Sequence, residues 1–312
     1  MASDLNKSTG KVYLIGAGPG DPKLLTIRAA EAIRAADVIV YDYLVNPEIL
    51  SHSRPSVELI YAGKRGGEKS ISQQQINRVL IDRATIGQVV ARLKGGDPFI
   101  FGRGGEEAEA LAEASVDWEV IPGISSGIAA PAYAGIPLTH RDRSSIVTFI
   151  TGHESQGSSR APIDWDALAK LPGTLVIFMC ADTITTIARR LVSGGRKPST
   201  PVAIIRWGTY SYQEVYTGDL DDLIAVDGLQ IESPLLAVVG EVAALSSKLS
   251  WFGEQALKYQ LDQLDAHLAA KLEYAGRPFS NDESLSDLLQ LDKSELNHAG
   301  RQAEICRTSG GL

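Results

Sequence analysis

The sequence predicts an α/β protein with two α/β domains around an interdomain cleft, followed by a tail that is part helix and part weakly ordered. Three observations support this fold class. In the first half, short apolar runs alternate with amphipathic helical stretches, which is typical of a parallel sheet covered by helices. A second series of apolar runs begins at residue 146. After Gly253 a leucine stripe replaces the strand pattern.

The expected strands are short runs rich in Val, Ile, Leu and Tyr. In the first half, strands are expected over 12–15, 38–41, 58–61, 89–93 and 119–121, and helices over 24–36, 72–84, 105–115 and 124–134. In the second half, strands are expected over 146–150, 174–178, 202–205, 214–216 and 235–239. The charged segment between the two series places the predicted domains at 11–140 and 145–253. Small ligands usually bind where two domains meet.

The remaining residues, 254–312, are expected to form a helix and a weakly ordered tail. Leucines recur at helical spacing at positions 257, 261, 264, 268 and 272. The stripe is too short for a coiled coil, so it predicts a helix that packs on its own domain or on a dimer partner. From Gly276 onward small and polar residues dominate, a composition typical of weak order.

Composition and charge argue against several classes of protein. The net charge is −8, which disfavours a protein whose main partner is a nucleic-acid backbone. No apolar run is long enough to span a membrane, and the N-terminus has no secretory signal. The two cysteines and five scattered histidines form no disulfide framework and no metal-ligand spacing. We therefore expect a cytoplasmic protein with no metal, no membrane and no nucleic-acid partner.

A glycine-rich turn at residues 16–21 (GAGPGD) directly follows the first expected strand. A dinucleotide-binding turn needs glycine at the sixth position for helix packing, but Asp21 stands there. Pro19 also lacks a backbone N–H that could reach a pyrophosphate. A nicotinamide dehydrogenase is therefore disfavoured. The turn either lets a ligand approach the backbone or only joins the strand to the next helix.

A second glycine-rich stretch covers residues 94–107, with five glycines in fourteen residues. Glycine at this density costs conformational entropy, so we interpret the stretch as a loop that wraps a ligand rather than as an ordinary connection. Asp97 can accept hydrogen bonds from ribose hydroxyls or an amino group. Phe99 and Phe101 offer apolar contact.

Two charged residues follow strands at the edge where ligands bind in a parallel sheet. Asp42 is a candidate base, and the alternative is a cap for the helical segment after Asn46. Lys64 is a candidate acid or charge stabiliser, and the alternative is a solvated lysine. Further basic residues near these motifs are candidates for binding carboxylates: Arg65, Lys94, Arg103, Arg141 and Arg143.

These motifs resemble the uroporphyrinogen-III C-methyltransferase family, within the tetrapyrrole methylase superfamily. The resemblance covers residues 11–253 and is carried by VYLIGAGPGDPKLLTIRAAEAIRAADVIVYD, GKRGG, SQQQIN, RLKGGDPFIFGRGGEE, VIPGISSG, AYAGIPLTHRD, TGHE and WFG. It implies a homodimer that binds S-adenosylmethionine in the interdomain cleft. It also implies transfer of two methyl groups to uroporphyrinogen III, giving precorrin-2 for sirohaem and/or cobalamin biosynthesis.

The resemblance also implies roles for individual residues. Asp42 falls on the family's proton acceptor and Lys64 on its proton donor. The positions implied to contact the cofactor are Pro19, Gly95, Gly96, Asp97, Ile100, Ser125, Ser126, Met179 and Gly208. Tyr43 stands where arginine is common in the family. Only ten residues precede the first strand, so the dehydrogenase-chelatase activities of some relatives are expected to be absent.

Two alternatives stay open beside this interpretation. A methyltransferase acting on a later corrin precursor is disfavoured by the length of the 94–107 stretch. A non-catalytic S-adenosylmethionine-binding partner would keep the glycines, yet it would not need Asp42 and Lys64. Incubation with uroporphyrinogen III distinguishes these possibilities.

Overall fold

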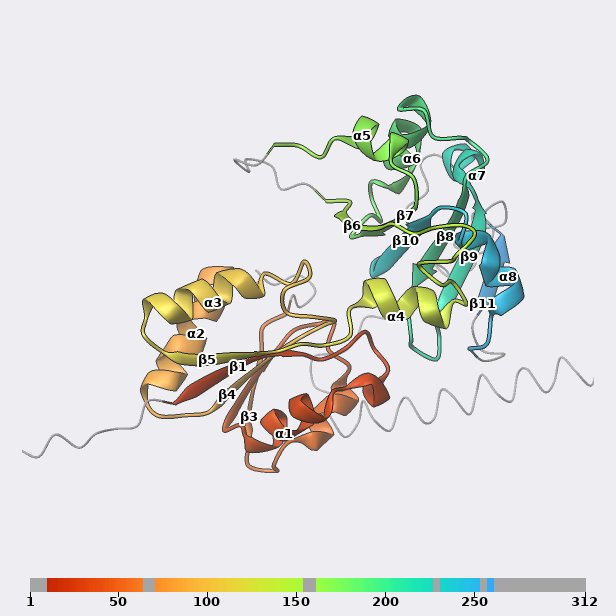
Figure 1. Cartoon of the computed structure of the whole chain (residues 1–312). Coiled ribbons are helices and arrows are strands. Elements are labelled where there is room, and N and C mark those ends of the chain that lie inside the picture. Colours follow the sequence, from red (N-terminus) through yellow and green to blue (C-terminus); the bar gives the residue numbers. More distant parts are fainter. Residues whose placement is uncertain (1–9, 64–70, 154–160, 227–230, 253–256, 261–312) are drawn as a thin grey trace, which may run out of the picture. The chain divides into compact units, whose positions relative to one another are not determined.

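The computed structural model describes residues 10–63, 71–153, 161–226 and 231–252, and the backbone of 257–260. These residues form two β-sheets with flanking helices (Figure 1), so the predicted α/β class is confirmed. They all belong to one unit of contacts that spans residues 1–265. The predicted domain boundary between residues 140 and 145 stays a prediction, because residues on both sides of it fall in that unit.

The first sheet is parallel and five-stranded, in the order β3-β2-β4-β1-β5. Its strands are β1 (Lys11–Gly16), β2 (Val38–Tyr41), β3 (Glu58–Tyr61), β4 (Val90–Lys94) and β5 (Asp117–Ile121). Each strand was expected from its apolar run, and the expectation is confirmed to within two residues at every end. Because all the strands run the same way, all their carboxyl ends lie at one edge.

Helices cover both faces of this sheet (Figure 1). The helical elements are η1 (Pro22–Leu24), α1 (Ile27–Ala35), η2 (Pro47–His52), α2 (Gln73–Thr85) and α3 (Gly104–Glu113). Side chains alternate between the two faces along a strand. Ile39 therefore packs with Ile33 of α1, whereas its neighbour Val40 packs with Leu80 of α2 and Leu111 of α3.

The first helix begins later than its apolar pattern predicts. A helix was expected from Leu24, but α1 starts at Ile27 and a separate turn of 3-10 helix precedes it. Thr26 has an extended backbone, and its hydroxyl accepts a hydrogen bond from Ala29 N–H (3.1 Å). Threonine is a favoured N-cap, so Thr26 sets the start of the helix rather than the apolar stripe.

The second sheet is six-stranded and mixed, in the order β11-β9-β8-β10-β7-β6. Its strands are β6 (Val147–Thr151), β7 (Thr174–Phe178), β8 (Pro201–Arg206), β9 (Glu214–Asp219), β10 (Leu235–Val239) and β11 (Leu257–Gln260). Strands β6, β7 and β8 run in one direction, whereas β9 and β10 run in the other. The carboxyl ends of β6, β7 and β8 therefore lie at one edge of this sheet, and those of β9, β10 and β11 lie at the opposite edge.

Helix α4 (Ser126–Tyr133) follows the first sheet in sequence but packs against the second. Its Ala130, together with Ala134 and Ile136 beyond it, shares a core with Phe178 of β7 and Val238 of β10. The remaining helical elements are α5 (Trp165–Lys170), α6 (Ile184–Ser193), α7 (Leu220–Ala225), η3 (Ala243–Leu245) and α8 (Ser246–Leu249).

The predicted helix that starts the tail is wrong at its first turn. Residues 257–260 form strand β11, which pairs in parallel with β9. The alternating sequence Leu-Lys-Tyr-Gln suits a strand as well as a helix turn, and pairing with an open sheet edge decides between them. The other leucines of the stripe and the expected weakly ordered tail lie outside the described residues.

Candidate functional site

Three loops rich in glycine meet at the carboxyl edge of the first sheet. They follow β1, β4 and β5, which are neighbours in the strand order. Gly18 N–H donates to Gly96 O (3.2 Å) and Gly96 N–H donates to Gly18 O (2.7 Å), so the first two loops are bridged in both directions. The connections after β1 and β4 cross opposite faces of the sheet. Ligands of open α/β sheets bind at such a switch point.

Close approach of the backbones explains why glycine is needed in these loops. A Cβ atom on Gly16 would lie 2.4 Å from the Cα of Gly123, and one on Gly123 would lie 2.3 Å from the carbonyl oxygen of Gly96. Gly96 differs, because a Cβ there would have space, with the nearest atom 3.6 Å away at Ser126 N. Its φ of +70° is the feature that favours glycine. The atoms nearest to such a Cβ belong to Ser125 and Ser126, so Gly96 lies beside these two predicted cofactor residues.

Asp97 ties two of the loops together. Its Oδ1 accepts a hydrogen bond from Phe99 N–H (2.8 Å), and its Oδ2 accepts one from Gly123 N–H (3.1 Å). The carboxylate thus already holds the loop after β4 against the loop after β5. Its predicted contact with a ligand would use the lone pairs that these two bonds leave free.

Asp21 has a role that the sequence did not reveal. Its backbone N–H donates to the Thr209 hydroxyl (2.9 Å), and its Oδ2 accepts from the Tyr133 hydroxyl (2.9 Å). Its Oδ1 also caps η1 by accepting from Lys23 N–H. The residue that disfavours a dinucleotide-binding turn therefore connects the first glycine-rich loop to α4 and to the segment after β8.

The cap alternative for Asp42 is wrong. Asn46 itself caps η2, because its Oδ1 accepts a hydrogen bond from Glu48 N–H (3.0 Å). Asp42 instead accepts from Leu44 N–H through Oδ1 (3.2 Å) and faces the Arg92 guanidinium through Oδ2 (3.4 Å). Its side chain keeps 27% of its surface exposed, so it stays accessible at the loop edge.

Arg92 belongs to a buried charge network, which we define as Asp42, Arg92, Lys94 and Glu107. Glu107 of α3 is fully buried, and its Oε1 accepts from Arg92 Nε (3.1 Å) and Lys94 Nζ (3.0 Å). Burial lowers the pKa of Lys94, and the neighbouring Arg92 charge lowers it further, while Glu107 opposes both effects. Gln73 of α2 donates a further bond to the same oxygen (3.1 Å).

The sequence carried a signal for this network. Positions 90, 92 and 94 share one face of β4, and Val90 on that face is core. Two cations at core positions of a buried strand require a carboxylate partner. Glu107 is one residue before Ala108 and four before Leu111 on the buried side of α3, so helical spacing places it toward those cations.

The second sheet contributes the other predicted residues at the ends of β7 and β8. Met179 follows β7, has φ +52° and exposes half of its surface. Gly208 follows β8, and a Cβ there would lie 2.3 Å from the Cβ of Ala130, so it allows close packing on α4. Phe101 of the long glycine-rich loop contacts Phe178, the residue before Met179, with ring centroids 4.9 Å apart. Loops from both sheets therefore meet near Met179.

Left-handed backbone is concentrated in these same loops. Among the described residues other than glycine, φ is positive at Phe101 and Arg103 after β4, at Met179 after β7 and at Trp207 and Thr209 after β8, and outside these loops at Ser115 before β5. Each such residue costs about 1–3 kcal/mol, and such strain collects where a ligand is held.

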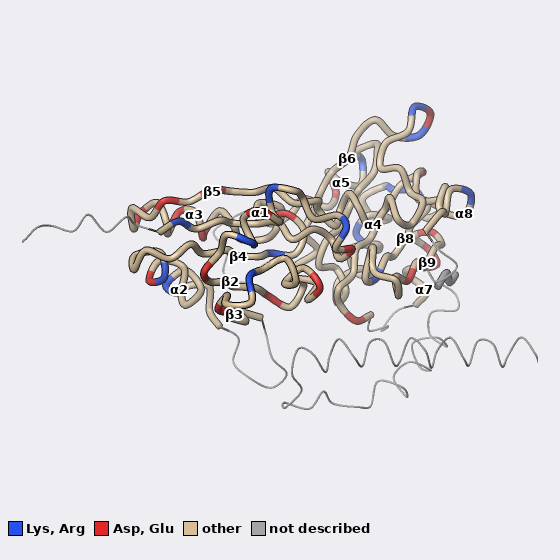
Figure 2. The backbone as a smooth tube through the Cα atoms, turned by 90° about the horizontal axis from the view of Figure 1, so that it is seen from below, with Lys and Arg blue, Asp and Glu red and all other residues tan. Residues whose placement is uncertain are grey.

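Several predicted basic contacts are placed elsewhere or are already paired. Lys94 is only 4% exposed and bound to Glu107, so its assignment to substrate carboxylates is wrong. Arg103 pairs with Glu106 (2.7 Å). Basic and acidic positions are interspersed along the described backbone (Figure 2). Lys64 and Arg65 lie outside the described residues.

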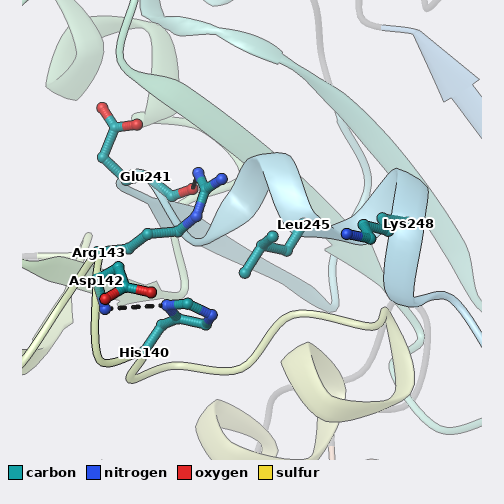
Figure 3. A pocket seen from close by; sticks show the side chains of 6 residues that line it. All are labelled: His140, Asp142, Arg143, Glu241, Leu245 and Lys248. Carbon is teal, nitrogen blue, oxygen red and sulfur yellow. Dashed lines mark hydrogen bonds between the residues drawn. The ribbon is translucent and has the colours of Figure 1, made fainter.

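A cavity of about 460 Å³ lies at the opposite end of the second sheet (Figure 3). Its lining residues are His140, Asp142, Arg143, Glu241, Leu245 and Lys248. Glu241 follows the carboxyl end of β10, which runs antiparallel to β7, so the cavity is at the far end from Met179. Arg143 points toward this cavity, and its predicted place beside the glycine-rich loops is wrong.

Among the described residues, no group of three or more His, Cys, Asp or Glu side chains could hold a metal ion. Within the same part of the chain, no helix has the length and apolar character to cross a lipid bilayer.

Comparison with known proteins identifies the class to which this fold and site belong. The family model of the tetrapyrrole (corrin/porphyrin) methylases matches residues 11–224. The chain therefore belongs to the tetrapyrrole methylases, as its motifs predicted.

Individual relatives point to one branch of the family. The uroporphyrinogen-III C-methyltransferase of Bacillus subtilis is 49% identical over 255 residues, which are 81% of this chain and 99% of that protein. The uroporphyrin-III C-methyltransferase of Thermus thermophilus, solved with S-adenyl homocysteine, matches with a TM-score of 0.65 and 35% identity. That match covers 76% of this chain and all of the solved one.

Other relatives are longer. The siroheme synthase of Sodalis glossinidius is 50% identical over 253 residues, which are 80% of this chain but 53% of that protein. The chain thus spans about half the length of the siroheme synthases that it matches.

Proposed function

We propose that the chain transfers two methyl groups from S-adenosylmethionine to carbon atoms of uroporphyrinogen III, giving precorrin-2 for sirohaem and/or cobalamin biosynthesis. One observation carries the proposal beyond family membership. Nearly the whole length of a uroporphyrinogen-III C-methyltransferase aligns with this chain at 49% identity.

The glycine-rich loops fit the methyl donor. A Cβ atom on Gly96 would meet no atom closer than 3.6 Å, and the exposed side chains of Ile100 and Met179 offer apolar contact. S-adenosylmethionine supplies a methyl group on a positively charged sulfur. The residues proposed to hold it are Pro19, Gly95, Gly96, Asp97, Ile100, Ser125, Ser126, Met179 and Gly208.

The chain then has to orient the substrate and remove a proton. A ring carbon of uroporphyrinogen forms a bond to the methyl group while the methyl–sulfur bond breaks, so positive charge moves to the substrate. Loss of a substrate proton restores the electron pair to the ring. Asp42 is the proposed acceptor, because its partly exposed carboxylate stands at the edge where the loops meet. Lys64 is the proposed proton donor.

The decisive test mixes the purified chain with S-adenosylmethionine and uroporphyrinogen III under reducing conditions and follows product mass. Two added methyl groups are expected. A product with methyl groups only when a later corrin precursor is supplied would favour the alternative substrate. Binding of S-adenosylhomocysteine without turnover of either substrate would favour a non-catalytic partner.

We also propose that the protein is a cytoplasmic homodimer. Support comes from the family resemblance and from the two-cysteine composition, which suits a reducing compartment. Light scattering on the full chain would give a dimer mass, and a monomer mass at assay concentration would contradict this proposal.

A further inference from the structure

The three inner members of the buried charge network, Arg92, Lys94 and Glu107, have no part in the function proposed above. All three are almost completely buried: the side chains of Arg92 and Lys94 are 4% exposed, and that of Glu107 is 0% exposed. They occupy the apolar layer between the first sheet and the helices α2 and α3, on the same face as Val40 and Val90.

Stability alone does not account for charges in this layer. Taking ions out of water costs several kcal/mol each, and replacing a buried ion pair by packed apolar side chains is often neutral or stabilising. Two cations and two carboxylates make the network neutral overall. Its outer member, Asp42, is the residue proposed to accept the substrate proton, and Arg92 links it to the inner charges.

The link is the way in which Arg92 is held. Its Nε binds Glu107 (3.1 Å), and its Nη1 donates to the carbonyl oxygen of Leu93 (3.0 Å). Only Nη2 reaches Asp42, over a long 3.4 Å contact. Charge-assisted hydrogen bonds between a guanidinium and a carboxylate are normally about 2.7–2.9 Å. Glu107 thus holds the guanidinium at a distance from Asp42.

We propose that Glu107 is a positioning residue for Asp42, which acts through Arg92 by keeping the guanidinium from closing onto the Asp42 carboxylate. This inference rests on the proposed role of Asp42 as proton acceptor. With Glu107 in place, Asp42 Oδ2 keeps only the long contact to Arg92, so it can still accept a proton from the substrate. Without the Glu107 charge, Asp42 is the remaining carboxylate of the network, and Arg92 moves toward it.

The hydrogen bonds of Glu107 make one substitution selective for its charge. All three donors converge on Oε1, while Oε2 is buried and has no hydrogen-bond partner among the described residues. In Glu107→Gln, the amide oxygen still offers an acceptor at the Oε1 position and the NH₂ group takes the unpartnered position, but the charge that attracts the Arg92 guanidinium away from Asp42 is gone. The variant then loses the negative charge while the shape and the acceptor remain.

The first arm of the experiment compares Glu107→Gln with Glu109→Gln in the full chain. Glu109 is exposed on the same helix, so it controls for the chemical change alone. We expect kcat to fall about tenfold in Glu107→Gln, within the range of couplings measured inside one charge network. The affinity for S-adenosylhomocysteine should stay within about twofold, and Glu109→Gln should match the unmodified chain in both measurements.

The second arm is a double-mutant cycle with Asp42→Asn. If Glu107 acts through Asp42, adding Glu107→Gln to Asp42→Asn should slow turnover by less than about twofold, because the group that it positions is already lost. A further tenfold loss would show an independent structural effect and overturn the inference. Unchanged kcat in the single Glu107→Gln variant would also overturn it.

The cycle separates this inference from the proposed function. Near-normal turnover by Asp42→Asn would reject the base itself, whatever Glu107 does. If Glu107→Gln does not fold, Glu107→Asp replaces it in the same cycle, because it keeps the charge but shortens the reach to Arg92. A loss of kcat by Glu107→Asp that disappears in the Asp42→Asn background supports the positioning role, and an additive loss overturns it.

Discussion

The two sheets of this protein organise their strand ends differently. In the first sheet every strand is parallel, so five loops leave from one edge. In the second sheet, β9 and β10 run antiparallel to β6, β7 and β8. The carboxyl ends of β6, β7 and β8 alone therefore lie at the edge that carries Met179. The first sheet therefore has more loop positions at which a polar group can be placed beside a ligand.

The proposed roles follow this difference. The first sheet supplies the candidate base, Asp42, and the bridged glycine loops around Gly18 and Gly96. The second supplies single residues in strained backbone, such as Met179, and close-packing positions such as Gly208. We infer that the parallel sheet provides the chemistry and most of the binding, while the mixed sheet completes the binding surface.

The largest effect is expected from a pair of substitutions, one in the part of the chain that forms the first sheet and one in the part that forms the second. The pair tests whether the first sheet provides the chemistry. Asp42→Asn keeps the shape of the side chain but removes its basicity, so turnover should fall about 10²–10⁴-fold. Asp164→Asn in the second half should be neutral, because Asp164 caps α5 (2.9 Å to Ala167 N–H) and asparagine caps equally well. Steady-state turnover of both variants is the measurement. Equal, small effects would remove Asp42 from the mechanism.

A second pair compares glycines with positive φ in the two halves. Gly96 (φ +70°) lies in the bridged loops, whereas Gly195 (φ +107°) lies in the connection between α6 and β8 with open space around it. Alanine at either position should cost about 1–2 kcal/mol of unfolding free energy through backbone strain. Only Gly96→Ala should also weaken S-adenosylhomocysteine binding, by tenfold or more, in calorimetric titration. Equal affinity in both variants would mean that the Gly96 loop does not hold the cofactor.

A third test concerns the contact that joins the two regions. The Tyr133 hydroxyl donates to Asp21. Burial and this hydrogen bond raise the pKa of Tyr133 from 10.0 to about 12. The unfolded chain therefore loses this proton before the folded chain does, so this contribution to stability is complete below pH 10 and is lost between pH 10 and 12.

Tyr133→Phe should accordingly lower the free energy of unfolding by about 1 kcal/mol at neutral pH. The variant should also show a shallower loss of stability across the alkaline range. Denaturant unfolding at a series of pH values measures both quantities. Parallel curves for the variant and the unmodified chain would contradict the raised pKa.

The smallest expected effect lies in the second sheet. Burial raises the pKa of the Cys180 thiol to about 12, although its neighbour Met179 is half exposed. The thiolate is the reactive form, so Cys180 should resist thiol reagents at neutral pH until the chain unfolds. Thiol titration of a Cys306→Ser variant, with and without denaturant, is the measurement. Rapid labelling of the folded chain would show that the end of β7 opens.

Local pattern was enough to predict most of the strands and the edge at which Asp42 lies. Runs such as Val38–Tyr41 are apolar on both faces, because a parallel sheet is covered by helices on each side, and this pattern survives in the sequence. Hydrophobic periodicity was a weaker predictor where the same residues suit both a helix and a strand. Residues 257–260 form a strand because β9 offers an edge, which no local signal shows.

The sequence by itself determined the fold class, the family and the glycines that let the loops come together. Only the tertiary structure decided which partners two of the carboxylates have: Asp21 joins α4 to the first loop, and Asp42 faces Arg92. The reason is physical. Backbone conformation depends on neighbouring residues, whereas the energy of a charge depends on its burial and on partners up to about a hundred residues away.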